Sequence, residues 1–108
     1  MKRYVLTKSA KNDLDEIWFY IATQSGSIAP AEQVIWRLHE KIVSLAANPG
    51  SGRRCDDIDP AGRCSPLGNY IVYYREESRR IVITHVFHGK RNQAKAWKQP
   101  ASGKKPRT

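Results

Sequence analysis

Apolar residues recur at helical spacing in two stretches of the first half of the chain. The first stretch predicts a helix that Thr7 or Ser9 caps and that ends around Ser25 and Gly26. The second opens near Pro30, which a first helical turn tolerates, and ends at residues 48–50. The two stripes are Ala10, Leu14, Ile17, Trp18 and Ile21, then Ala31, Val34, Ile35, Leu38, Ile42, Leu45 and Ala46. The short connection predicts a helical hairpin that packs its stripes on the rest of the chain.

Extended segments flank the two helices. Residues 3–7 are β-branched and aromatic enough for a first strand. Residues 70–74 and 81–87 predict two further strands that pair as a hairpin. Residues 50–62, rich in glycine and charge, predict an irregular arm or an edge strand, followed by the strand that precedes the hairpin. The order β-α-α-β-β-β predicts an α+β fold, with an N-terminal strand and a two-helix hairpin packed on a small, mostly antiparallel twisted sheet.

The same patterns predict the core and the extent of the domain. We expect residues 1–98 to form one domain, with a short helical turn after Asn92 through Trp97. Residues 99–108 read as a basic disordered tail. The predicted core consists of Leu14, Ile17, Trp18, Ile21, Leu38, Ile42, Leu45, Tyr70, Val72, Ile83 and Val86.

Length and composition narrow the cellular setting. A chain of 108 residues has room for one core. The longest apolar run, residues 17–22, is too short to cross a bilayer, and the N-terminus lacks the features of a signal peptide. We therefore expect a cytoplasmic protein with no membrane partner, in which Cys55 and Cys64 stay reduced.

The charge of the chain is unevenly distributed. Basic residues outnumber acidic ones by 19 to 10, which gives a net charge of +9. Residues 88–108 hold seven Lys and Arg and no acid. This asymmetry predicts a polyanion or an acidic protein as partner, attracted by forces that salt weakens. The alternative, which we favour for the last ten residues, is a tail that only aids solubility.

Side chains suited to catalysis or metal binding are sparse. Asp13 with Glu16 reads as acids on the exposed face of a helix start, and Asp56 with Asp57 lies in a loop without an apolar environment. A metal site is disfavoured because His85 and His88, which could join the two cysteines, are three apart in a strand and point to opposite faces. No glycine loop indicates a nucleotide, so we expect no cofactor and no metal.

The basic residues of the second half are better placed for binding. They come from the arm, the strand before the hairpin and the end of the last strand, which can converge on one edge of the sheet. Guanidinium groups there would bind phosphates or carboxylates, and a histidine would exchange a proton near neutral pH. The alternative is that these residues are solvated charges that prevent aggregation of the edge. They are Arg53, Arg54, Arg63, His88, Lys90 and Arg91.

Several motifs in this order resemble one known family. The first helix has Ala10-x-x-Asp13-Leu14-x-x-Ile17-x-x-Tyr20, and the second closes with Leu38-x-x-x-Ile42-x-x-Leu45-x-x-x-Pro49-x-x-Gly52-Arg53. Tyr70-Ile71-Val72-Tyr73-Tyr74 precedes Val86-Phe87-His88-Gly89-Lys90-Arg91. From about Arg3 to Asn92 the chain resembles the ParE branch of the RelE/ParE toxins.

This resemblance implies the toxin component of a bacterial type II toxin-antitoxin module. The partners would be a ParD-like antitoxin, bound in a hetero-oligomer, and DNA gyrase, with no direct contact to nucleic acid required and no enzymatic activity. We expect the antitoxin to contact Arg53, Arg54 and Arg63. The target would contact Phe87, His88, Lys90, Arg91 and Trp97.

The RelE branch supplies a rival function, ribosome-dependent cleavage of mRNA. Arg63 and Arg91 match positions where that branch has functional arginines, and His88 would complete a catalytic set. Trp97, however, lies where several of those nucleases place a tyrosine, and an indole offers no acid or base chemistry near neutral pH. The sequence therefore favours gyrase as the target. A degenerate module that binds the antitoxin without toxicity is the third alternative.

Overall fold

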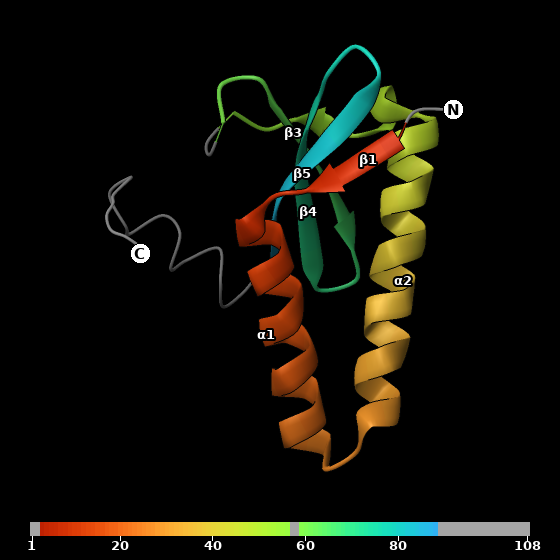
Figure 1. Cartoon of the computed structure of the whole chain (residues 1–108), viewed down its shortest axis with the longest axis vertical. Helices are drawn as coiled ribbons and strands as arrows, with labels where there is room; N and C mark the ends of the chain where they lie inside the picture. The colour runs from red at the N-terminus through yellow and green to blue at the C-terminus, as the bar shows by residue number, and fades with distance from the viewer. Residues whose placement is uncertain (1–2, 57–58, 89–108) are drawn as a thin grey trace.

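Two helices and a five-stranded sheet form the described part of the chain (Figure 1). The computed structural model describes residues 3–56 and 59–88. The expected helical turn through Trp97 and the expected tail at residues 99–108 lie outside these ranges. The elements are β1 (Arg3–Leu6), α1 (Lys8–Ser25), α2 (Ile28–Ala47), the 3-10 helix η1 (Pro49–Ser51), β2 (Arg53–Arg54), β3 (Gly62–Leu67), β4 (Tyr70–Glu76) and β5 (Arg80–His88).

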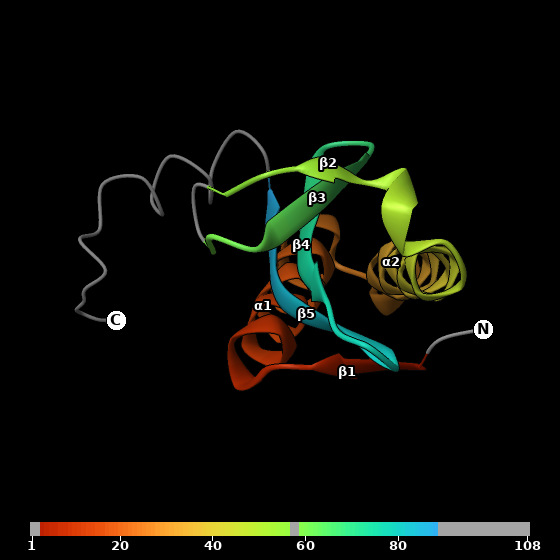
Figure 2. The same cartoon turned by 90° about the horizontal axis from the view of Figure 1, so that it is seen from above.

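The sheet is mixed, with β1 and β2 at its two edges (Figure 2). The strand order is β1-β5-β4-β3-β2, in which β1 runs parallel to β5 and all other pairs are antiparallel. The chain passes from β1 through the helices to the far edge and then meanders back, so that the first half of β5 pairs with β1. This confirms the predicted α+β fold, and the segment expected as an arm or edge strand supplies β2, a two-residue edge strand.

The helices begin and end at residues with a physical reason to be there. Thr7 Oγ1 accepts a hydrogen bond from the Ala10 N–H at 3.0 Å, which confirms Thr7 as the first cap. Gly26 ends α1 with φ at 71°, a backbone region that favours glycine. Ser27 then caps α2, which starts at Ile28, two residues before the expected Pro30.

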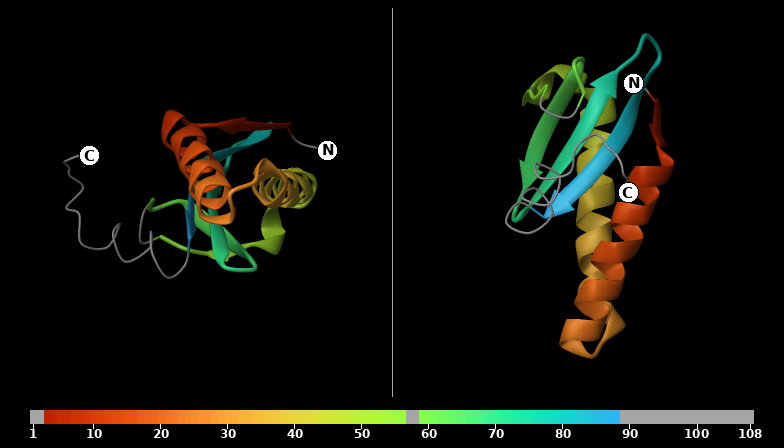
Figure 3. Two further views of the ribbon diagram at one scale, coloured as in Figure 1. Left: turned by 90° about the horizontal axis from the view of Figure 1, so that it is seen from below. Right: turned by 90° about the vertical axis from the view of Figure 1, so that its left-hand side faces the viewer.

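The helices cover one face of the sheet, and the connection between them projects beyond it (Figure 3). The main buried cluster lies between the two layers and consists of Ala10, Ile17, Leu38, Ile42, Leu45, Ala46, Val72, Tyr74, Ile81, Ile83 and Val86. A second, smaller cluster contains Cys55, Cys64, Tyr73 and Phe87. Strand alternation puts Tyr73 on the face opposite Val72 and Tyr74, so this second cluster occupies the side of the sheet away from the helices. Within residues 3–56 and 59–88, no helix is both long and apolar enough to cross a membrane.

The predicted core needs one correction. Leu14, Ile21 and Tyr70 are partly buried and pack against the main cluster, but Trp18 is half-buried and belongs to neither cluster. The reason is angular, because a residue next to Ile17 on a helix lies about 100° around the axis and so falls at the margin of the stripe.

A β-bulge explains why both Ile83 and Val86 are buried under the helices. Strict alternation would put these two residues on opposite faces, but Tyr74 pairs with Ile83 and Tyr73 with His85, so Thr84 is an extra residue in β5. The Thr84 carbonyl accepts a hydrogen bond from the Thr7 hydroxyl at 3.0 Å. The bulge therefore also ties the start of α1 to the sheet.

Leu38 is fully buried at the centre of α2, which makes it a direct test of the core. Leu38→Ala should lower the free energy of unfolding by about 2–5 kcal/mol, because it leaves a cavity among tightly packed side chains. Chemical denaturation of both proteins measures this difference. A loss below about 0.5 kcal/mol would show that Leu38 is not buried.

Candidate functional site

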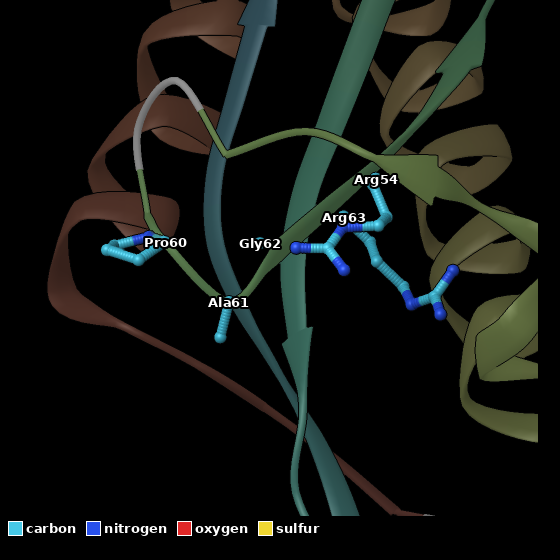
Figure 4. A pocket seen from close by; sticks show the side chains of 5 residues that line it. All are labelled: Arg54, Pro60, Ala61, Gly62 and Arg63. Atoms are coloured by element: carbon cyan, nitrogen blue, oxygen red, sulfur yellow. The ribbon is translucent and has the colours of Figure 1, made fainter.

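Arginines gather at the β2 edge of the sheet (Figure 4). Arg53 and Arg54 are exposed on β2, and Arg54 pairs with Arg63 of the neighbouring strand β3. Arg54 and Arg63, together with Pro60, Ala61 and Gly62, line a depression of about 360 Å³. The carboxylates of a protein partner or a phosphate are the chemical groups that such an edge attracts. The structure thus brings Arg53, Arg54 and Arg63 to one edge, as expected. It does not bring His88 there, because His88 pairs with Tyr70 of β4 at the other end of the sheet.

Arg63 has a structural task within this group. Its side chain is half-buried, and Nη1 donates a hydrogen bond of 2.7 Å to the carbonyl oxygen of Gly52. Arg54, its neighbour across the strands, is exposed. Of these two arginines, Arg54 is therefore the more accessible to a partner, whereas Arg63 holds the backbone that leads into β2.

The N–H group of Gly52 is held as well. The Tyr74 hydroxyl accepts a hydrogen bond from it at 3.1 Å and donates one of 2.6 Å to the carbonyl oxygen of Pro49. A Cβ at position 52 would overlap the Tyr74 hydroxyl and approach the Cys64 carbonyl oxygen to 2.9 Å, so this position requires glycine. We call these bonds among Pro49, Gly52, Arg63 and Tyr74 the Gly52 network.

The Tyr74 phenol keeps its proton over a wide pH range. Burial raises its pKa above the ordinary value of 10.0, although the hydrogen bond with Gly52 and the charge of Arg63 act in the opposite direction. A phenol that stays protonated remains a donor to the Pro49 carbonyl. The Gly52 network is therefore intact at neutral pH.

Two other arginines of the sheet have carboxylate partners. Arg75 lies 3.4 Å from Asp59 and 3.4 Å from Glu77, and Arg80 lies 2.8 Å from Glu77. The hydrogen bond from Arg80 lowers the pKa of the Glu77 carboxyl at this turn. These pairs balance positive charge near the β4–β5 turn, whereas Arg53 and Arg54 at the β2 edge are exposed.

Two of the residues expected to contact the target, Phe87 and His88, lie at the end of β5 on opposite faces of the sheet. Phe87 is buried on the sheet face away from the helices, where its ring contacts Tyr73 with centroids 5.4 Å apart. His88 follows on the other face, with its ring edge-to-face to Tyr70 at 5.3 Å. The remaining expected residues, Lys90, Arg91 and Trp97, lie outside the described residues. Only Phe87 and His88 can therefore be placed, and Phe87 is an anchor of the sheet.

The role of Asp13 needs a second correction. It was expected on the exposed face of a helix start, but its carboxylate accepts a hydrogen bond of 3.0 Å from the Val86 N–H and lies 3.3 Å from His85 Nδ1. Because β1 pairs with β5 only as far as Ile83, the Val86 N–H at that edge needs a side chain as acceptor. The sequence feature that could have indicated this contact is the position of Asp13 at the margin of an apolar stripe.

The candidate catalytic and metal sites can also be placed. Glu16 is exposed one helical turn from Asp13, and Asp57 lies outside the described residues. Among residues 3–56 and 59–88, no three His, Cys, Asp or Glu side chains are grouped closely enough to hold a metal ion.

The fold is shared with a solved structure, whose title is the chromosomal ParDE TA system from P. aeruginosa. The likeness has a TM-score of 0.70 at 24% sequence identity and covers 82% of this chain and 96% of that one. A family model described as the ParE toxin of the type II toxin-antitoxin system, parDE, matches residues 4–93. The protein is thus a toxin of a type II toxin-antitoxin system.

More specifically, the chain belongs to the ParE toxin family. It is similar to Toxin ParE1 of two strains of Mycobacterium tuberculosis, CDC 1551 / Oshkosh and H37Rv, with 38% identity over 87 residues that cover 80% of this chain and 88% of the relative. It is also similar to Toxin ParE1 of Caulobacter vibrioides, with 33% identity over 92 residues that cover 85% and 94%.

The Gly52 network predicts a pH-dependent stability. Tyr74→Phe should lower the free energy of unfolding by about 1–3 kcal/mol at neutral pH, because the Gly52 N–H and the Pro49 carbonyl lose their partner. The folded-state pKa of Tyr74 lies above its unfolded value of 10.0, so this stabilisation is complete below that value and is lost as the pH rises through the folded-state value. Denaturation of both proteins from neutral to strongly alkaline pH measures the effect. A constant difference above pH 10 would contradict it.

Proposed function

We propose that this toxin inhibits DNA gyrase by binding it and that a ParD-like antitoxin neutralises the toxin. The observation that carries this proposal is that two of the three candidate catalytic side chains, Arg63 and His88, make contacts within the fold. Arg63 donates to the Gly52 carbonyl, and His88 packs against Tyr70. RNA cleavage needs charged and proton-transferring groups around the scissile phosphate. Inhibition by binding needs only a recognition surface.

The face of the sheet away from the helices supports the same proposal. Its centre is the cluster of Cys55, Cys64, Tyr73 and Phe87, whose side chains are all buried, so this part of the face is closely packed. His85 stacks on Phe87 with ring centroids 4.9 Å apart, and its Nδ1 faces the Asp13 carboxylate. A nuclease that used this face would need basic groups in place of these aromatic and sulfur side chains.

The antitoxin proposal depends on charge and on exposed apolar side chains. Arg53 and Arg54 offer exposed guanidinium groups to an acidic segment that runs along the β2 edge. Phe19 and Tyr20 on α1 are 66% and 46% exposed, and an amphipathic helix laid beside the hairpin would cover such side chains. The antitoxin would therefore wrap the toxin in a hetero-oligomer.

This function needs no cofactor, no catalytic residue and no direct contact with nucleic acid. Gyrase acts on DNA inside the cell, so the proposal places the toxin in the cytoplasm. The buried thiols of Cys55 and Cys64 fit this location, because the cytoplasm keeps cysteines reduced.

The antitoxin proposal predicts binding that depends on salt. Affinity for the cognate antitoxin should fall as the salt concentration rises from about 0.1 M to about 0.5 M. Substitution of both Arg53 and Arg54 by Glu should weaken binding by about tenfold or more and flatten the salt dependence, because charge reversal turns attraction into repulsion. Isothermal titration calorimetry measures both effects.

Lys8 and Lys11 supply the matched control for this experiment. Both are exposed at the start of α1, and their double substitution by Glu changes the net charge by the same amount as the double change at Arg53 and Arg54. This control should keep most of the affinity. Equal losses in the two double variants, or binding independent of salt, would contradict a specific role for the β2 edge.

The gyrase proposal predicts which assay the purified toxin affects. The toxin should inhibit DNA supercoiling or trap cleaved DNA with gyrase, and it should leave ribosome-bound mRNA intact. Arg91→Glu should impair inhibition more than His88→Gln, because a charge reversal adds repulsion at a recognition surface. Codon-specific cuts in mRNA that disappear in His88→Gln, with supercoiling unaffected, would establish the nuclease instead.

A further inference from the structure

One strongly exposed aromatic side chain lies on the outer face of α2. Among residues 3–56 and 59–88, the exposed large hydrophobic side chains all belong to the two helices. Trp36 is 60% exposed and Ile28 is 55% exposed. Glu32 lies between them at intervals of four residues, so the three side chains form a stripe along one side of the helix. We call Ile28, Glu32 and Trp36 the α2 stripe.

The exposed ring of Trp36 packs on the side chain of His39, which in turn contacts β1. The two rings stack with centroids 5.7 Å apart and an interplanar angle of 27°. His39 Nδ1 lies 3.2 Å from the Tyr4 hydroxyl of β1, which fixes the imidazole against the sheet edge. An aromatic side chain that is ordered before binding loses less entropy when a partner covers it. Tryptophan is also enriched among the residues that dominate binding energy.

The segment from residue 12 to Trp36, directly before the exposed Arg37, carries a charge opposite to that of the chain as a whole. Residues 12–36 contain four of the ten acidic residues and none of the 19 basic ones, so the rest of the chain holds 19 basic and six acidic residues. Asp15, Glu16 and Glu32 are exposed, and this segment includes the connecting end of the hairpin that projects beyond the sheet (Figure 1). The toxin is therefore bipolar, with an acidic hairpin end and a basic sheet.

We propose that the α2 stripe docks on a positively charged protein surface with an apolar pocket for Trp36, and that this surface belongs to DNA gyrase. The proposal rests on the proposed function. An enzyme that binds DNA carries a basic surface, because it must neutralise phosphates. The acidic end of the hairpin complements such a surface and, at the same time, repels the acidic antitoxin segment expected at the β2 edge. In a symmetric dimer through this stripe, Glu32 and the acidic hairpin end would face the same acidic segment of the second copy and be repelled by it.

The proposal is tested with full-length variants and purified gyrase. Trp36→Ala should weaken gyrase binding and inhibition of supercoiling by about tenfold or more, as expected for loss of an anchor side chain. Trp36→Phe should retain part of both, because it keeps an aromatic ring. Glu32→Arg should weaken binding and reduce its dependence on salt. Glu76→Arg, a reversal at an exposed glutamate of β4, is the matched control and should behave like the wild type.

Antitoxin affinity and oligomeric state are measured for the same variants. Both should stay unchanged, and unchanged melting temperatures show that the variants fold. If the wild type inhibits gyrase and Trp36→Ala inhibits equally well, the inference is wrong while the proposed function stands. A wild-type toxin with no effect on gyrase would overturn both. If Trp36→Ala instead loses antitoxin binding, or breaks an assembly of the toxin with itself, the α2 stripe belongs to that partner and the inference is overturned.

Discussion

The backbone of Gly52 is held at both of its polar groups by side chains of the sheet, and the position of the basic edge depends on these bonds. The Tyr74 hydroxyl accepts a hydrogen bond from the Gly52 N–H and donates one to the Pro49 carbonyl just after α2. Arg63 donates a hydrogen bond to the Gly52 carbonyl oxygen. The helix end, the edge strand β2 and the centre of the core are therefore linked through one residue, because Tyr74 is itself fully buried. Arg53 comes directly after this glycine, so the same bonds fix where the exposed arginines begin.

The other end of the helical hairpin is fixed in a comparable way. The Thr7 hydroxyl donates a hydrogen bond to the Thr84 carbonyl at the bulge, and the Asp13 carboxylate accepts one from the Val86 N–H. The first turns of α1 are therefore bonded to β5. Both ends of the hairpin are thus fastened to the sheet, and its connecting end projects beyond the sheet (Figure 3). This arrangement separates part of the charge, since six of the eleven described basic residues lie on strands of the sheet and the acidic segment at residues 12–36 lies on the hairpin. A single domain can in this way offer two surfaces of opposite sign.

The fold was predictable because its helices and strands follow strong local patterns. The stripes of α1 and α2, the Thr7 cap and the order of helices and strands along the chain could all be predicted from periodicity and turn residues, whereas the parallel pairing of β1 with β5 could not. The details of the site could not, since they depend on contacts between residues distant in the chain. The task of Arg63 follows from its distance to the Gly52 carbonyl, and that of Asp13 from the point where β1 stops pairing with β5. Trp36 falls outside the buried stripe of α2, but its support by the His39 ring was visible only in the structure.

The central claim is that this toxin acts by occupying its target rather than by chemistry. The packed face of the sheet and the use of Arg63 as a support favour it, and so do the two exposed surfaces of opposite charge. Titration of gyrase with the purified toxin, at gyrase concentrations well above the dissociation constant, tests this claim most directly. Inhibition by occupancy predicts that supercoiling activity falls linearly with added toxin, ends at a fixed molar ratio and does not change on longer incubation. Complete loss of activity that develops with time at a small fraction of that ratio would show turnover and contradict the claim.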